Sequence, residues 1–198
     1  MSGLIVIEGI DGTGKSTLAQ ALAEALRAGG DEVVVSAEPT RRSPEGRRLR
    51  ALAAEGREGV TVDDEIELFV ADRRWHLEHV VEPALRAGRI VILDRYYYST
   101  MAYQGARGAD PEAILKRHRA FAPEPDLLVL LDLPVVEALA RITDQRGSTL
   151  DAFEGREYLE RVRAVFDTIQ HPRLLRLDAR APTPELVTRV MDAWRTAP

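Results

Sequence analysis

Apolar residues along this chain form short, nearly continuous runs, and longer amphipathic stretches separate the runs. The runs predict strands that are buried on both faces, at 4–8, 33–35, 89–94, 126–132 and 174–178. The stretches between them carry apolar residues at helical spacing, most clearly at 15–28, 63–87 and 183–194. This alternation predicts an α/β fold, a three-layer sandwich in which a five-stranded parallel sheet carries helices on both faces.

Acidic residues stand at or just after the ends of four predicted strands: Asp11, Glu38, Asp94 and Asp132. In parallel sheets of this kind, ligands bind beyond the carboxyl ends of the strands. We therefore expect these side chains to lie along one rim of the sheet, and we expect the functional site on that rim.

A complete phosphate-binding motif follows the first predicted strand and opens the first predicted helix. It reads G-x-x-x-x-G-K-[ST], from Gly9 through Ile10, Asp11, Gly12, Thr13, Gly14 and Lys15 to Ser16, with Thr17 next. Glycines let the backbone N–H groups and the helix N-terminus face phosphate oxygens. Lys15 supplies a charge for the β- and γ-phosphates, and the Ser16 hydroxyl is placed to ligate Mg²⁺. The strand before and the helix after the motif favour an ATP site of the P-loop NTPase class over a chance glycine-rich turn.

Composition narrows the remaining possibilities. The chain has 198 residues and a net charge of −5, which fits a single domain and argues against general binding to nucleic acid. It contains no cysteine, so disulfides and cysteine-based metal sites do not arise. No apolar run approaches the roughly 18 residues that a membrane span requires. The sequence also begins without a basic leader, and we expect a cytoplasmic protein with no membrane partner.

Several short segments, in this order and at this spacing, resemble the thymidylate kinase family along nearly the whole chain. The matching segments are 7–17, 38–40, 68–73, 94–96, 99–105, 131–134, 153–154 and 161–163. The resemblance implies phosphorylation of dTMP to dTDP with ATP as donor and Mg²⁺ as cofactor. It also implies a homodimer that pairs through helices beside the sheet.

Three other functions compete with this interpretation. Another (deoxy)nucleoside monophosphate kinase would share the same fold and loop. A regulatory GTPase would need an Asn-Lys-x-Asp guanine motif, which the sequence lacks. A nucleotide-binding module without catalysis would leave Lys15, Ser16 and Arg95 without a reason to occur together.

Transfer between two phosphates needs positive charge more than base catalysis, because the acceptor phosphate is already ionised near neutral pH. Arg95 follows the third strand on the expected rim, where it can fork onto phosphate oxygens rather than pair with a surface carboxylate. The predicted catalytic residues are Lys15, Arg95 and Asp11. Two roles stay open for Asp94: it contacts Mg²⁺ through water, or it holds Lys15 or a helix end.

Phe69 and Arg73 stand four residues apart on a predicted helix and share a face. Spacing alone favours a core phenylalanine and an exposed arginine. The resemblance instead implies that Phe69 stacks on thymine, that Arg73 bonds a base carbonyl, and that Tyr103 packs against the sugar. The full set of predicted dTMP contacts is Asp11, Glu38, Arg50, Phe69, Arg73, Arg95, Thr100, Tyr103 and Gln104.

Arg50 belongs to a basic segment with Arg41, Arg42, Arg47 and Arg48. Most of these arginines read as solvated charges. Arg50 is the predicted monophosphate contact, because it stands where the family has an arginine. The four histidines, His76, His79, His118 and His171, lack metal-ligand spacing, and we assign them no role.

A lid over ATP is expected at about 143–155, where the sequence departs from the family. Many members carry an arginine that Ala152 replaces here, and others carry one in the loop, where this chain has Gly12. Either Arg146 or Arg156 can substitute, and the choice stays open. The resemblance makes Arg141 an adenine contact, so Arg141 and Arg146 complete the predicted ATP-binding set.

Overall fold

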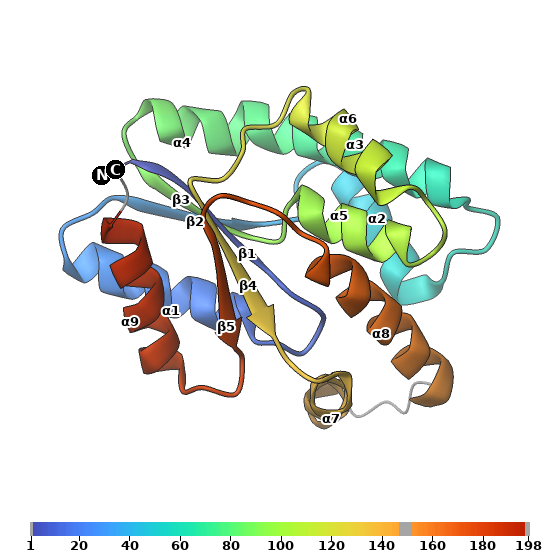
Figure 1. The fold of residues 1–198 in the computed structure, drawn as a ribbon. Helices are drawn as coiled ribbons and strands as arrows, with labels where there is room; N and C mark the ends of the chain where they lie inside the picture. The colour runs from blue at the N-terminus through green and yellow to red at the C-terminus, as the bar shows by residue number, and fades with distance from the viewer. Residues whose placement is uncertain (1, 147–151, 197–198) are drawn as a thin grey trace.

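The computed structural model describes residues 2–146 and 152–196, and its centre is a five-stranded sheet (Figure 1). All strand pairs are parallel and the strand order is β2-β3-β1-β4-β5. The strands are β1 (Gly3–Glu8), β2 (Val33–Ala37), β3 (Ile90–Asp94), β4 (Leu127–Asp132) and β5 (Leu174–Asp178). The five predicted strands are confirmed, with ends that shift by one or two residues.

Helices cover both faces of the sheet, as predicted (Figure 1). Helices α1 and α9 contact each other on one face, and α3 to α6 and α8 lie over the other. The helical elements are α1 (Lys15–Ala28), α2 (Pro44–Glu55), α3 (Val62–His76), η1 (Leu77–Val81), α4 (Glu82–Arg86), α5 (Tyr97–Gly105), α6 (Pro111–Arg119), α7 (Val135–Arg146), α8 (Ala152–Asp167) and α9 (Thr183–Arg195).

The prediction of one regular helix over 63–87 is wrong in its middle. The α-helix ends at His76, the π-helical turn η1 follows, and α4 resumes at Glu82. Pro83 lies in the first turn of α4 and has no N–H to donate to the preceding turn. A wider turn just before the proline accommodates the missing hydrogen bond.

The register of the strands places the functional rim. β1 is buried along its whole length at the centre of the sheet, and its Ile7 pairs with Asp94 of β3 and Val129 of β4. Glu38 follows β2 directly and donates its N–H to the Asp94 carbonyl. The loop after β1 therefore emerges between the ends of β3 and β4, and Glu38 lies beyond β3, at the end of β2. The acidic residues thus lie along one rim of the sheet, as predicted.

The expected lid and the expected absence of a membrane span can be compared only with the described residues. The expected lid at about 143–155 has its flanks in α7 and α8, and residues 147–151 lie outside the described part of the chain. Among the helices of residues 2–146 and 152–196, each is too short or too polar to cross a bilayer.

Candidate active site

The loop after β1 requires glycine at two positions, one because of close packing and one because of its backbone conformation. Gly12 has φ +83°, and a Cβ there would stand 2.5 Å from the Ala138 carbonyl oxygen of α7. Gly14 has φ +87° and caps α1 in the left-handed conformation that glycine tolerates. The close approach of α7 explains why this loop has no arginine at position 12.

Lys15 begins α1 and turns back into the loop. Its Nζ donates to the Ile10 carbonyl at 2.8 Å, and the side chain is buried. Burial first, and the charge of Arg95 second, lower the pKa of Lys15 to about 8. The protein therefore does not fully stabilise the charged form of Lys15. The negative charge of a bound polyphosphate would stabilise it further.

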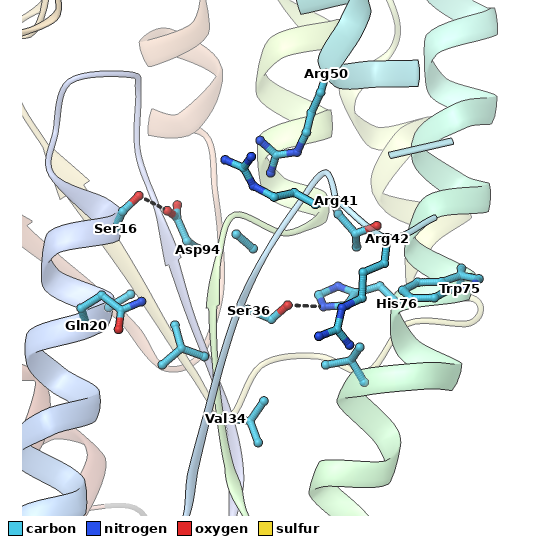
Figure 2. A pocket seen from close by; sticks show the side chains of 15 residues that line it. Ser16, Gln20, Val34, Ser36, Arg41, Arg42, Arg50, Trp75, His76 and Asp94 are labelled. Atoms are coloured by element: carbon cyan, nitrogen blue, oxygen red, sulfur yellow. Dashed lines mark hydrogen bonds between the residues drawn. The ribbon is translucent and has the colours of Figure 1, made fainter. Parts of the chain in front are cut away.

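Ser16 and Asp94 meet across the rim (Figure 2). The Ser16 hydroxyl donates to Asp94 Oδ2, so Asp94 contacts the first turn of α1, one of the roles left open for it. Within the described residues, the other carboxylate oxygen, Oδ1, is buried and has no hydrogen-bond partner. A hydroxyl beside a carboxylate oxygen with spare acceptor capacity is a donor set that suits Mg²⁺, so these residues fit the predicted metal site.

Arg95 links the loop to helix α5. It has φ +72°, a left-handed conformation that is uncommon for a residue with a side chain. Its Nη2 donates to Asp11 Oδ1 at 2.8 Å and to the Tyr103 hydroxyl at 3.2 Å. The Tyr103 hydroxyl also accepts the Asp11 backbone N–H at 3.0 Å. One contact cluster on the rim thus joins three predicted residues: Asp11 of the loop, Arg95 just after β3 and Tyr103 of α5.

Glu8, the last residue of β1, is a member of this region that sequence reasoning missed. Its carboxylate is fully buried and accepts the backbone N–H groups of Tyr96 and Ser99, at 2.8 and 3.0 Å. Burial raises the pKa of Glu8 to about 7, against the lowering effect of Ser99 and Arg95. The available signal was a charged residue at the end of an otherwise apolar buried strand.

The predicted base pocket is a buried ionic network. Arg73 is only 1% exposed, so the alternative of a solvated arginine is excluded. Its Nε donates to Glu38 Oε2 at 2.9 Å, and its Nη2 lies 3.3 Å from the Thr100 hydroxyl. Three predicted dTMP contacts are therefore adjacent. Burial tends to raise the pKa of Glu38, but Arg73 and His76 together bring it below its ordinary value.

Two of the histidines for which the sequence indicated no role belong to this network. His76 Nδ1 lies 2.9 Å from Glu38 Oε1, and its Nε2 lies 2.7 Å from the Ser36 hydroxyl. Arg73 Nη1 donates to His118 Nδ1 at 2.9 Å. Burial and Arg73 lower the pKa of His118 to about 2, so this ring is neutral. Their spacing in sequence carried no sign of these contacts.

Gln104 and Phe69 flank the network. The Gln104 amide is held by Glu65 at 3.2 Å and by Arg107 at 3.1 Å, two residues that the sequence did not indicate. Phe69 is half-buried, one turn before Arg73 on α3. A half-buried ring beside a buried guanidinium is compatible with a stacking surface, which the prediction requires.

A pocket of about 490 Å³ opens between α1, β2 and α3, and arginines line its mouth (Figure 2). Arg41 and Arg50 lie across this mouth from Ser16 and Asp94. Burial and the nearby charge of Arg41 lower the pKa of Arg50. Arg41, which the sequence suggested was simply solvated, therefore joins Arg50 at a place suited to an anion.

A second buried network holds the backbone that carries these arginines. Asp72 of α3 accepts the Thr40 N–H at 2.8 Å and the Thr40 hydroxyl at 2.6 Å. Asp72 also accepts the hydroxyl of Ser43, the residue that caps α2 by accepting the Gly46 N–H. The loop before α2, and with it the start of the helix that bears Arg50, is thereby fixed to α3.

Of the three arginines predicted at the adenine and lid, the structure describes the side chains of two. Arg141 of α7 donates to the Ala179 carbonyl at 3.2 and 3.1 Å, between the ends of β4 and β5. Arg156 of α8 is exposed and lies 3.8 Å from Glu160. The side chain of Arg146 lies outside the described part of the structure. The choice between Arg146 and Arg156 stays a prediction.

A phosphate-binding loop at the centre of a parallel sheet, faced by arginines on the same rim, defines a P-loop phosphotransferase. A family model for thymidylate kinase matches residues 7–190. The chain belongs to the thymidylate kinase family.

Individual relatives agree with the family model. The thymidylate kinase of Akkermansia muciniphila is 50% identical over 190 residues, which cover 96% of this chain and 90% of the relative. That of Desulfotalea psychrophila is 47% identical, over 89% of this chain and 86% of the relative. That of Xanthomonas campestris pv. campestris is 51% identical, over 90% and 76%.

Proposed function

We propose that dTMP and ATP meet on the rim where β1, β2 and β3 end, and that Lys15, Arg95 and Asp11 carry the transfer. Family membership gives the overall reaction, the phosphorylation of dTMP to dTDP with ATP as donor. The observation that carries our assignment is the contact of Arg95 with Asp11 and Tyr103, which joins the ATP loop to α5.

In the proposed mechanism, a phosphate oxygen of dTMP attacks the γ-phosphorus of ATP, and the bond from that phosphorus to the bridging oxygen of ADP breaks. Lys15 and Arg95 place positive charge around the group in transit, where it stabilises the transition state most. Arg50, with Arg41 beside it, holds the acceptor phosphate. Mg²⁺, held by Ser16 and with Asp94 beside it, would neutralise charge on the ATP phosphates.

The base would lie against Phe69, with Arg73 and Thr100 at its polar edge. Arg73 is held from behind by Glu38 and His118, so its guanidinium is fixed before the substrate arrives. Pre-positioning of this kind reduces the ordering cost of binding. Gln104, kept in place by Glu65 and Arg107, adds a further amide to this edge.

The test is kcat/KM for dTMP, dUMP, dCMP and UMP under saturating MgATP. A donor at a carbonyl suits thymine and uracil, whereas cytosine presents an amino group and a bare nitrogen to the same side chains. Each mismatched buried group costs about 1–3 kcal/mol. The Tyr103 ring would pack against the sugar where a ribose 2′-hydroxyl would lie, which disfavours ribonucleotides. The expected order is dTMP, then dUMP, with dCMP and UMP far behind.

A rate with dCMP or UMP equal to that with dTMP would reject this base pocket and favour the broader nucleoside monophosphate kinase. The homodimer and the cytoplasmic location stay predictions that rest on the family and the sequence. Sedimentation that gives a monomer at micromolar concentration would refute the dimer. Replacing Arg146 and Arg156 singly by Ala would show which arginine contributes to kcat.

A further inference from the structure

The carboxylate of Glu8 occupies an unusual place for an acid, at the buried end of the central strand. Its Oε1 accepts the N–H groups of Tyr96 and Ser99, and its Oε2 accepts the Ser99 hydroxyl at 2.5 Å. A buried charge is costly unless hydrogen bonds surround it. The two N–H contacts anchor the start of α5, which a purely structural role would explain.

The contact with the Ser99 hydroxyl goes beyond that anchoring role. Ser99 Oγ accepts a hydrogen bond from Arg95 Nη1 at 2.8 Å while it donates its own proton to Glu8. The chain therefore has one direction, from Arg95 to Ser99 to Glu8. On its other side, Arg95 donates from Nη2 to Asp11. The guanidinium is held by one carboxylate directly and by a second carboxylate through a hydroxyl.

We propose that Glu8, acting through the Ser99 hydroxyl, is a positioning residue that sets the guanidinium of Arg95 for phosphoryl transfer. This inference rests on the proposed role of Arg95. Glu8 itself is fully buried behind the rim, so its assigned role is to position and not to contact the substrate. Glu8 acts by fixing the orientation of Arg95, and small errors in the position of a catalytic group lower the rate strongly.

A glutamine at position 8 would keep the shape but not the direction of the chain. The amide oxygen would still accept the N–H groups of Tyr96 and Ser99. The amide nitrogen, however, can only donate, so the Ser99 hydroxyl would receive a hydrogen bond where it now gives one to Glu8. The Ser99 proton would lose its acceptor and turn elsewhere, so the lone pair that faces Arg95 would no longer be held in one direction. Replacing Ser99 by alanine removes the same link and leaves Glu8 intact.

The experiment measures kcat/KM for dTMP, KM for ATP and melting temperature in Glu8→Gln, Ser99→Ala, Arg95→Ala and the double variant Ser99→Ala/Arg95→Ala. We expect each of the first two variants to lower kcat/KM about ten-fold, the loss of one hydrogen bond to a charged group. The KM for ATP should stay near the wild-type value. In the Arg95→Ala background, Ser99→Ala should have no further effect, because the group that it positions is gone.

Thr188→Ala is the matched control, because it removes a hydroxyl that bonds the Pro184 carbonyl of its own helix α9. It should leave all three measurements unchanged. If Glu8→Gln fails to fold, Ser99→Ala and the double variant decide the question alone. A normal kcat/KM in Ser99→Ala, or losses that multiply in the double variant, would overturn the positioning role. A normal kcat/KM in Arg95→Ala would instead overturn the proposed function of Arg95.

Discussion

The phosphate-binding loop after β1 (the ATP loop) and the predicted base pocket are built by opposite means. The loop is one continuous segment that offers backbone groups and a single lysine, and its glycines are dictated by local geometry. The predicted base pocket is assembled from side chains of three helices, α3, α5 and α6, and of Glu38 after β2, with Arg73 of α3 at its centre. The difference shows how far the function of each region depends on the rest of the fold.

Because the phosphate-facing groups of the loop all come from one segment, changes to its side chains should affect catalysis and leave the fold intact. Because the pocket is also part of the buried interior, changes there should affect stability and catalysis together. Four predictions test this contrast, in order of decreasing effect.

The largest effect is expected from Glu38→Gln, which removes the negative charge beside Arg73. Breaking one partner of a buried ion pair costs about 3–5 kcal/mol, because the remaining charge stays desolvated. For a chain of this size that corresponds to a fall of roughly 6–20 °C in Tm. Thermal unfolding checks it.

Glu67→Gln is the matched control, on α3, the helix that carries Arg73. Glu67 pairs with Arg117 at 2.6 Å, but it is 64% exposed, and surface pairs contribute about 0–1 kcal/mol. Equal Tm changes in the two variants would contradict the view that the base pocket also stabilises the fold.

Lys15→Ala should lower kcat about 10²-fold or more, since it removes a positive charge that stabilises the transition state. Tm should stay unchanged, because the backbone sets the conformation of the loop. Lys116→Ala, which removes an exposed lysine of α6, serves as the control and should retain full turnover. Near-normal turnover in the Lys15 variant, with a normal melting curve, would remove the loop as the catalytic ATP site.

This contrast also explains which parts could be predicted from the sequence. The strands were predictable because apolar runs report burial directly, and the ATP loop because its residues are contiguous. The interruption of the helix over 63–87 follows from Pro83 but was not predicted, since one proline within an apolar pattern does not say where the helix adjusts. The fold and the loop thus rest on local signals.

The surroundings of the base pocket could not be predicted in the same way. Arg73 has partners 35 and 45 residues away, Glu38 and His118, and no spacing rule connects residues at such separations. The family resemblance indicated Arg73 and Glu38 but not that they pair, and it left both histidines of the network without a role. Glu8 was visible only as one acid in an apolar strand.

Binding of ATP should weaken as pH rises from 7 to 9. With a pKa of about 8, lowered by burial and by Arg95, Lys15 is about nine-tenths charged at pH 7 and about one-tenth charged at pH 9. If only the charged form binds, the apparent Kd for MgATP rises about ten-fold. Calorimetric titration at pH 7, 8 and 9 measures it. Lys15→Arg stays charged throughout, so its Kd should change less, and a flat profile in the unaltered protein would show that Lys15 does not titrate there.

The smallest effect concerns Phe69, and it locates the boundary between the base pocket and the core. Phe69 is half-buried on α3, whereas Arg73 one turn later is fully buried. Phe69→Leu keeps an apolar side chain but loses the flat ring, and aromatic stacking contributes about 0.5–1.5 kcal/mol beyond area. We expect the KM for dTMP to rise about five-fold, which corresponds to about 1 kcal/mol, with Tm and the KM for ATP unchanged.

Phe121→Leu, at another half-buried ring that packs on Arg74, is the control and should leave the KM for dTMP unaltered. If Phe69→Leu lowers Tm and leaves the KM for dTMP unchanged, Phe69 belongs to the core, and the stacking surface must be sought on another side chain.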